Sequence, residues 1–410
     1  MNHYRADTSE ESTGSLRLLV FLMFLLFAMT TDAVGSVIPT VVTEFRLSLT
    51  AAGAFHYVPM TAIAIGGLGL GFLADRWGRR SAIVFGLVLY GVSSLLFAIG
   101  HTFGFFVALL AVSGVGISIF KVGGLALIGD IAHSGSLHTR LMNAAEGFFA
   151  VGSIIGPAIV AALLQAGLSW KWLYVVAAAI CVLLILMAQR TRFPPSRAHE
   201  SDSMDLRGAL QILRRPYALA VATLILLYVS VEVAIYVWMP TYTQGYRGSQ
   251  AWLPLYGLTI FFVLRACGRF LGAWMLLHLQ WRAVLTLCGT AIAACFVISL
   301  LGGVALAAWL LPASGLAMSV VYPTLNSKGI SHFPQSQQGA AAGVFLFFTA
   351  AAAALGPLAM AKVSDSLGDI RYGFVLATGF ALLLCTGLIV NWLVPAAQAE
   401  REQSAGERDE

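Results

Sequence analysis

Charge is scarce in this sequence. Asp, Glu, Lys and Arg make up 10% of the 410 residues, whereas 59% are hydrophobic and the mean hydropathy is +0.84. Because a soluble domain usually carries about 25% charged residues, this chain has too little polar material to cover a surface in water. The composition excludes a soluble enzyme, a nucleic-acid-binding domain and a disordered scaffold. It indicates a protein that is surrounded mostly by lipid.

Several chemical signatures are missing as well. The 5 cysteines all lie within apolar runs, and no pair has the spacing of metal ligands. We therefore expect buried free thiols rather than a disulfide framework or a metal site. The sequence has no P-loop and no nucleophile motif, so we expect neither an enzyme, nor a cofactor, nor an ATP-driven pump.

Long apolar runs, by contrast, are abundant. A helix needs roughly 20 apolar residues to cross about 30 Å of hydrocarbon, and twelve such runs can be read. Backbone polar groups in lipid need internal partners, so we expect an all-α membrane protein with twelve transmembrane helices. The runs are 18–40, 55–73, 81–99, 105–128, 144–165, 172–187, 217–241, 253–277, 283–301, 304–323, 339–362 and 372–393.

Lys and Arg are distributed unevenly between the two sides of these spans. If both termini are inside, the inner segments carry 17 of these residues and the outer loops carry 5. Since positive residues accumulate on the cytoplasmic side, we expect both termini in the cytoplasm. The protein is then a multi-pass plasma membrane protein, and we expect a bacterial inner membrane.

The chain divides into two halves that repeat each other. We expect a six-helix bundle at 1–188, a cytoplasmic linker at 189–216, a second six-helix bundle at 217–394 and a disordered cytoplasmic tail at 395–410. Asp32 recurs as Glu232 and Gly156 as Gly356, both 200 residues later. Because each half has six spans, the halves have the same topology and are related by a pseudo-twofold axis along the membrane normal.

The loop after the second run carries a motif, Gly71-Phe-Leu-Ala-Asp75-Arg76-Trp-Gly78-Arg79-Arg80. It resembles the signature between helices two and three of the major facilitator superfamily (MFS). The resemblance implies two six-helix bundles around a central cavity, lined mainly by spans one, four, seven and ten. It also implies a cytoplasmic gate, although these charges could instead only anchor the loop inside. The gate residues would be Gly71, Asp75, Arg76, Gly78, Arg79, Arg80 and Asp130, which Arg79 could reach from the same side.

Spans five and eleven share a second motif of small residues and proline. Gly152, Gly156 and Pro157 lie in span five, and Gly356 and Pro357 lie in span eleven. Small residues let helices approach closely and proline bends a helix, so we interpret all five as helix-packing residues. The span-five motif resembles one that is frequent in drug antiporters.

Three ionisable residues lie well inside spans one, four and seven, namely Asp32, Lys121 and Glu232. A charge in mid-span costs at least about 2.5 kcal/mol, so such groups usually face a cavity or a partner. A carboxylate in a low-dielectric site can bind and release a proton near neutral pH. We predict that these three residues couple transport to protons. The other interpretation is a static ion pair.

A further group of polar and aromatic side chains is predicted to bind substrate. Sugars stack on aromatic rings and cations lie over them, although such rings also form lipid-facing bulk and interfacial belts. Among the charged members, Arg265 could instead neutralise Glu232. The candidates are Tyr228, Tyr236, Trp238, Tyr322, Asn326, Glu146 and Arg265.

Two stretches are similar to the fucose–galactose–glucose:proton symporter branch of the superfamily. They are residues 227–232 in span seven and residues 315–323 in span ten. Lys121 departs from the branch, which often has an acidic residue there. The resemblance implies proton symport of a sugar or similar small polar metabolite. The alternative is a proton antiporter that exports drugs or lipophilic, in particular cationic, compounds.

The expected partners are a small-molecule substrate, protons and the lipid bilayer, with no nucleic acid, and we expect a monomer.

Overall fold

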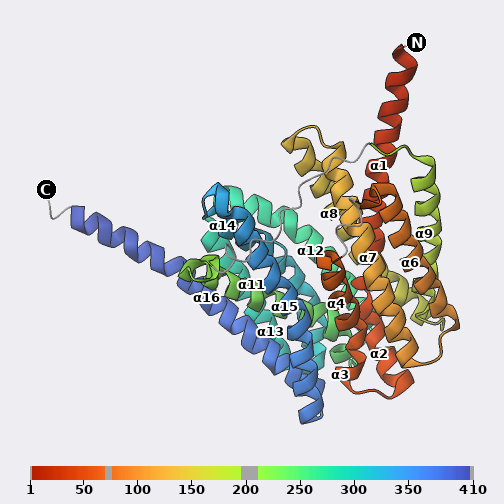
Figure 1. Ribbon diagram of the computed structural model, residues 1–410. Helices are drawn as coiled ribbons and strands as arrows, with labels where there is room; N and C mark the ends of the chain where they lie inside the picture. Colours follow the sequence, from red (N-terminus) through yellow and green to blue (C-terminus); the bar gives the residue numbers. More distant parts are fainter. Residues whose placement is uncertain (1, 70–75, 195–210, 407–410) are drawn as a thin grey trace. The chain divides into compact units, whose positions relative to one another are not determined.

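The computed structural model describes residues 2–69, 76–194 and 211–406, and the regular structure in these ranges is helical. The chain forms two compact units, residues 1–201 and 202–410, and each is described by itself (Figure 1). The division falls inside the polar stretch at 189–216, which the sequence predicts to be a linker.

The N-terminal unit is a helical bundle in which α1 packs on α8, and α7 packs on both α4 and α6. Its short connections keep chain neighbours together. The Ser48 hydroxyl, for example, accepts the Ala51 N–H at 3.2 Å and caps a one-turn helix. The helices are α1 (Asn2–Thr31), α2 (Val34–Phe45), α3 (Leu49–Ala52), α4 (Ala54–Gly69), α6 (Arg79–Leu96), η1 (Phe97–Ile99), α7 (Phe103–Ile131), α8 (Gly135–Gln165) and α9 (Trp172–Arg190).

The C-terminal unit is a second bundle, in which α11 packs on α15 and α16, and α12 packs on α13. Its first helix begins at Pro216, a position where proline's missing N–H costs no hydrogen bond. The helices are α11 (Pro216–Thr243), α12 (Trp252–His278), α13 (Trp281–Met318), α14 (Val321–Ser331), α15 (Gln335–Leu367) and α16 (Ile370–Gly406).

Eleven helical stretches in the described residues are long and apolar enough to cross a membrane. The longest, Trp281–Ser331, contains two of the predicted runs, 283–301 and 304–323. Between them the backbone leaves the helical conformation at Gly303, where φ is 67°. Glycine adopts such a conformation without steric cost. Divided at Gly303, the stretches account for the twelve spans that the sequence predicts.

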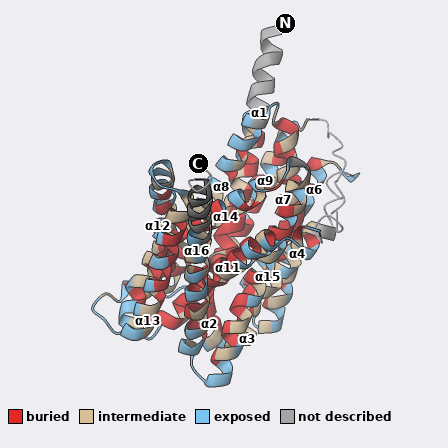
Figure 2. Cartoon of the chain, turned by 90° about the vertical axis from the view of Figure 1, so that its left-hand side faces the viewer, coloured by how far each residue is buried: buried red, intermediate tan, exposed pale blue. Residues whose placement is uncertain are grey.

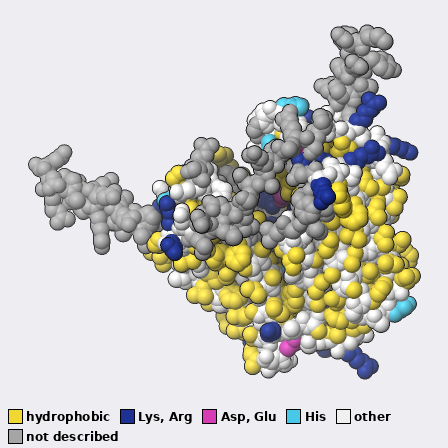
Figure 3. All heavy atoms as spheres, in the orientation of Figure 1, with side chains coloured by type: hydrophobic (Ala, Val, Ile, Leu, Met, Phe, Trp, Pro, Cys, Tyr) yellow, Lys and Arg dark blue, Asp and Glu magenta, His cyan; other side chains and the backbone are white. Residues whose placement is uncertain are grey.

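Burial identifies the central helix of each unit. In both Thr13–Phe45 and Pro216–Thr243, 72% of the most apolar window is buried, the highest share among the candidate spans (Figure 2). Other helices expose large apolar side chains, such as Phe270 and Leu301, which are 81% and 83% exposed. Apolar side chains cover most of the described surface in Figure 3. The spans that carry Asp32 and Glu232 are therefore interior helices.

The end of the chain differs from the sequence prediction. We predict disorder over 395–410, whereas α16 continues to Gly406. The reason is local, because the segment Ala-Ala-Gln-Ala-Glu-Arg at 396–401 consists of residues with high helix propensity.

Candidate coupling sites in the two units

Asp32 lies where span one is interrupted. Helix α1 ends at Thr31 and α2 begins at Val34. The Asp32 N–H still donates to the Ala28 carbonyl at 3.0 Å, so the residue closes the last turn of α1. The free N–H groups at the start of a helix carry positive partial charge. The start of α2 therefore favours a carboxylate at this point inside the span.

Helix α8 supports this interruption through its small-residue motif. A Cβ at Gly152 or Gly156 would overlap backbone atoms of α1, which for Gly156 belong to Met29. Between the two glycines, the Ser153 hydroxyl donates to Asp32 Oδ2 at 2.5 Å. The motif therefore holds α8 close enough to α1 for Ser153 to reach the carboxylate. The sequence predicts the packing glycines but not the role of Ser153, for which the available signal is its position between them.

This close approach gives a stability prediction. Gly156→Ala places a methyl group against the Met29 carbonyl, so α8 must move away from α1. We expect the free energy of unfolding to fall by about 1–3 kcal/mol, as for other overpacked sites. The matched control is Gly147→Ala on the same helix, because a Cβ at Gly147 meets nothing within 4 Å. Thermal unfolding of the purified variants in detergent measures both effects. Equal midpoints for the two variants would contradict the predicted contact.

Lys121 belongs to the same polar region of the N-terminal unit. Its Nζ lies over the Phe27 ring, 4.6 Å from the ring centroid, which is cation–π distance. Two carboxylates, Glu146 and then Asp32, act on it electrostatically. The structure thus places Lys121 within electrostatic range of Asp32, and the sequence predicts both to be coupling residues. Glu146, predicted as a substrate ligand, is exposed and also acts on Lys121.

In the C-terminal unit, Glu232 lies in a cluster of polar groups. Its Oε1 is 2.6 Å from Arg265 Nη2 on α12 and 2.9 Å from the Tyr228 hydroxyl one turn earlier on α11. Tyr228 is fully buried, and its hydroxyl also lies 2.7 Å from the Met318 carbonyl oxygen. Its ring stacks on that of Tyr322 at 6.3 Å. Arg265 therefore neutralises Glu232, the second of the two roles that the sequence leaves open.

The contact at Met318 falls where span ten is interrupted. Helix α13 ends at Met318 and α14 begins at Val321. Helix α12 lies very close to this point, because a Cβ at Gly268 or Gly272 would overlap Leu316 or Val320, respectively. Each unit thus combines a carboxylate on its central helix with a helix interruption and a neighbouring helix held close by glycines.

The remaining predicted substrate residues have different positions. Trp238 is 1% exposed, and its Nε1–H donates to the Pro357 carbonyl at 3.1 Å, so it joins α11 to α15. Tyr236 is half-buried, 6.4 Å from the Phe262 ring. Asn326 is half-buried on α14, and Tyr322 on the same helix accepts a hydrogen bond from Thr349. Gly356 lies against Ser230, two residues before Glu232, and a Cβ added at Gly356 would be 3.1 Å from Ser230.

The predicted gate is described only in part, because Gly71 and Asp75 lie outside the described residues. Arg79 Nε donates to Asp130 Oδ2 at 2.9 Å, and both residues are 4% exposed. Arg80 donates to the Gln189 carbonyl at 2.6 Å. The two arginines therefore tie the start of α6 to α7 and to α9, respectively. The same turn contains Gly78, with φ at 81°, and the exposed Arg76.

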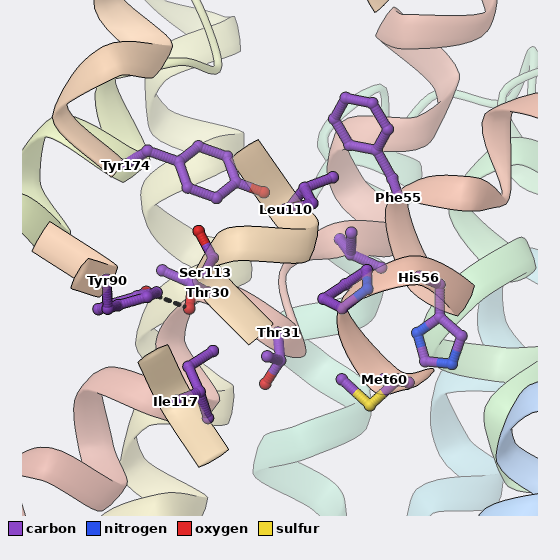
Figure 4. A pocket seen from close by; sticks show the side chains of 12 residues that line it. Thr30, Thr31, Phe55, His56, Met60, Tyr90, Leu110, Ser113, Ile117 and Tyr174 are labelled. Carbon is purple, nitrogen blue, oxygen red and sulfur yellow. Dashed lines mark hydrogen bonds between the residues drawn. The ribbon is translucent and has the colours of Figure 1, made fainter. Parts of the chain in front are cut away.

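A small cavity lies inside the N-terminal unit beside the interruption of span one (Figure 4). Its volume is about 20 Å³, and its lining includes Thr31, Ser113 and Tyr174. Thr30, also in the lining, is hydrogen-bonded to Tyr90 at 2.6 Å. A water molecule needs at least about 10–15 Å³, so this cavity has room for a water molecule but not for a sugar.

Ionisable side chains inside apolar spans, as at Asp32, Lys121 and Glu232, are typical of polytopic membrane proteins that move polar species. The sequence model of the Major Facilitator Superfamily matches residues 20–357. The chain therefore belongs to this superfamily and is a transporter rather than an enzyme.

Three curated relatives, each 28% identical in sequence, align with part of the chain. The 3-(3-hydroxy-phenyl)propionate transporter of Escherichia coli K12 aligns over 60% of this chain and 62% of its own length. The quinolone resistance protein NorA of Staphylococcus aureus aligns over 47% of this chain and 49% of its own length. EfpA of Mycobacterium tuberculosis, an uncharacterized MFS-type transporter, aligns over 44% of this chain and 34% of its own length. The chain thus spans less than two thirds of each relative's length.

Solved structures extend the likeness over most of the chain. The nucleoside transporter NupG has a TM-score of 0.72 at 14% identity, covering 92% of this chain and 98% of its own. The fucose:proton symporter FucP of E. coli, in its outward conformation, has a TM-score of 0.60 at 21% identity, covering 91% and 97%. At these identities the likeness shows the fold alone.

Proposed function

We propose that this chain is a proton-coupled symporter for a small polar metabolite, with Asp32 and Glu232 as the proton carriers. The supporting observation is that each unit places a carboxylate on its central helix beside a basic residue of another helix, Lys121 or Arg265. A nearby cation favours the ionised carboxylate, and separation from the cation in low dielectric favours the protonated form. Proton binding is thereby tied to a change in these contacts.

For the solute, we propose a sugar or similar small polar metabolite. The chain shares its fold with FucP, the fucose:proton symporter of E. coli. Within this class, Lys121 in span four favours a solute that carries a carboxylate, because a cation in low dielectric gains most from an opposite charge. The name of the 3-(3-hydroxy-phenyl)propionate transporter is in line with such a solute.

A second function, export of drugs or lipophilic compounds in exchange for protons, is favoured by a different observation. NorA, whose name refers to quinolone resistance, aligns over 47% of this chain. The same carboxylates would then bind protons on the way in while the solute moves out.

The remaining parts of the proposal concern topology. The protein lies in a bacterial inner membrane with both termini on the cytoplasmic side, because Lys and Arg accumulate on the side of the termini. The Arg79–Asp130 pair then lies at the cytoplasmic end of the N-terminal unit and forms part of a gate. We propose that the monomer is the working unit.

External pH in an unbuffered suspension of de-energised cells tests the proposal. Hexoses, polyols, organic anions and lipophilic cations are added one at a time to cells that express the protein. Symport makes the medium more alkaline, because protons enter with the solute. Antiport makes it more acidic. Cells that express Asp32→Asn are the control and are expected to show neither change. An absence of any change in cells with the unaltered protein would overturn proton coupling for these solutes.

A further inference from the structure

We propose that the Tyr228 hydroxyl couples the protonation state of Glu232 to the interruption of span ten. Tyr228 then acts as a positioning residue and not as the substrate ligand that the sequence predicts. The inference rests on the proposed function, which makes Glu232 a proton carrier.

The geometry places one donor between two acceptors. The Tyr228 hydroxyl is 2.9 Å from Glu232 Oε1 and 2.7 Å from the Met318 carbonyl oxygen. Both are hydrogen-bond distances, but a phenol has one proton to donate. A carbonyl only accepts, and so does an ionised carboxylate. Both contacts can therefore be full hydrogen bonds only when Glu232 carries a proton and donates it to the Tyr228 oxygen.

Each protonation state then has its own arrangement of hydrogen bonds. With Glu232 protonated, Glu232 donates to Tyr228 and Tyr228 donates to Met318. With Glu232 ionised, the carboxylate pairs with Arg265 and draws the Tyr228 proton, because bonds to ionised acceptors are the stronger ones. The proton on Glu232 comes from water and returns to water, while Tyr228 keeps its own proton and only rotates its O–H bond.

Rotation of the Tyr228 O–H bond decides whether the Met318 carbonyl has a hydrogen-bond donor. Met318 is the last residue of α13, and a helix leaves its last four carbonyls without an intrahelical N–H partner. In a buried setting, loss of the Tyr228 donor costs the free energy of an unsatisfied polar group. Ionisation of Glu232 therefore loosens the link between α11 and the end of α13, at the interruption of span ten.

The groups around Glu232 fit this assignment. From α12, Arg265 pairs with the carboxylate, and Arg269 acts electrostatically on Tyr228. From α14, the Tyr322 ring stacks on Tyr228. Helix α15 contributes the neutral Gly356 beside Ser230, and on α16 Gly387 meets Leu224. The charges facing the pair in the described contacts are thus the two arginines, which stay positive throughout.

Hydrogen–deuterium exchange of the purified full chain in lipid nanodiscs, measured between pH 5 and 9, tests the coupling. Rates are corrected for the intrinsic effect of pH on exchange. We expect amides of 315–326 to exchange about three- to tenfold faster when Glu232 is ionised than when it is protonated. In Glu232→Gln the protection is constant, because glutamine does not titrate. In Tyr228→Phe it is low at all pH values, since the donor to Met318 is gone.

Tyr242→Phe is the matched control, because it removes a hydroxyl from the same helix at a residue stacked on Phe374. It is expected to keep the unaltered pH dependence. A Tyr228→Phe protein with the same pH-dependent protection as the unaltered chain would overturn the proposal, and so would an unaltered chain whose protection is constant. If Tyr228→Phe fails to fold, Glu232→Gln alone decides, because retained pH dependence there also overturns it. Failure of the proposed function appears separately, as the absence of solute-induced pH changes in cells.

Discussion

Asp32→Asn and Glu232→Gln are each expected to abolish gradient-driven accumulation while leaving solute binding in place. Both replacements keep the shape of the side chain but remove the group that binds and releases a proton. The solute would then equilibrate across the membrane without being concentrated. Uptake of labelled solute into proteoliposomes under an imposed pH gradient measures accumulation, and equilibrium binding to the purified variants measures affinity. The same vesicles without a gradient report exchange, which needs no net proton movement.

The control for these two variants is Asp369→Asn. Asp369 is an exposed carboxylate whose Oδ1 accepts the backbone N–H of Arg371 in a connection of the C-terminal unit. Its replacement is expected to leave accumulation unchanged. Full accumulation by both Asp32→Asn and Glu232→Gln would contradict the coupling role and favour a static ion pair. Loss of binding together with accumulation would instead place the two carboxylates in the solute site.

Asp130→Asn is expected to have the largest effect on stability. Removal of one partner from a buried ion pair deprives the other of an opposite charge in low dielectric, which costs about 3–5 kcal/mol. Here Arg79 and Asp130 are each 4% exposed and lie 2.9 Å apart. We expect a strongly lowered thermal midpoint for the purified protein in detergent.

A double replacement distinguishes the buried charge from other causes. Arg79→Met combined with Asp130→Leu removes both charges and fills the space with apolar atoms, so we expect stability to return toward that of the unaltered protein. Arg76→Ala, in the same turn but exposed, is expected to change the midpoint little. A single Asp130→Asn variant as stable as Arg76→Ala would show that the pair contributes nothing to folding.

The repeat of the sequence recurs as a repeat of helix contacts. Gly156 and Gly356 are 200 residues apart. Gly156 lies against Met29 on the helix before Asp32, and Gly356 lies against Ser230, two residues before Glu232. Both halves therefore use a glycine of a neighbouring helix to approach the helix with the carboxylate. The offset was visible in the sequence because a helix contact of this kind favours glycine.

The partners of the carboxylates were not predictable in the same way. Ser153 is 121 residues from Asp32, and the donor to the Met318 carbonyl is 90 residues away in the chain. Serine is frequent at helix contacts in membranes and tyrosine is frequent at the membrane–water interfaces, so neither stands out by type. Their roles depend on how each helix is rotated about its axis, which the nearly uniform hydrophobicity of these spans does not encode.

By itself, the sequence determined the class of protein, the twelve spans, the division into two halves and the charged residues worth testing. It did so because the bilayer imposes length and hydrophobicity on every span separately. Only the tertiary structure decided that Ser153 holds Asp32, that Arg265 neutralises Glu232 and that Tyr228 reaches the end of α13. These contacts depend on which faces of different helices meet, and side chains far apart in the sequence become neighbours only when the helices pack.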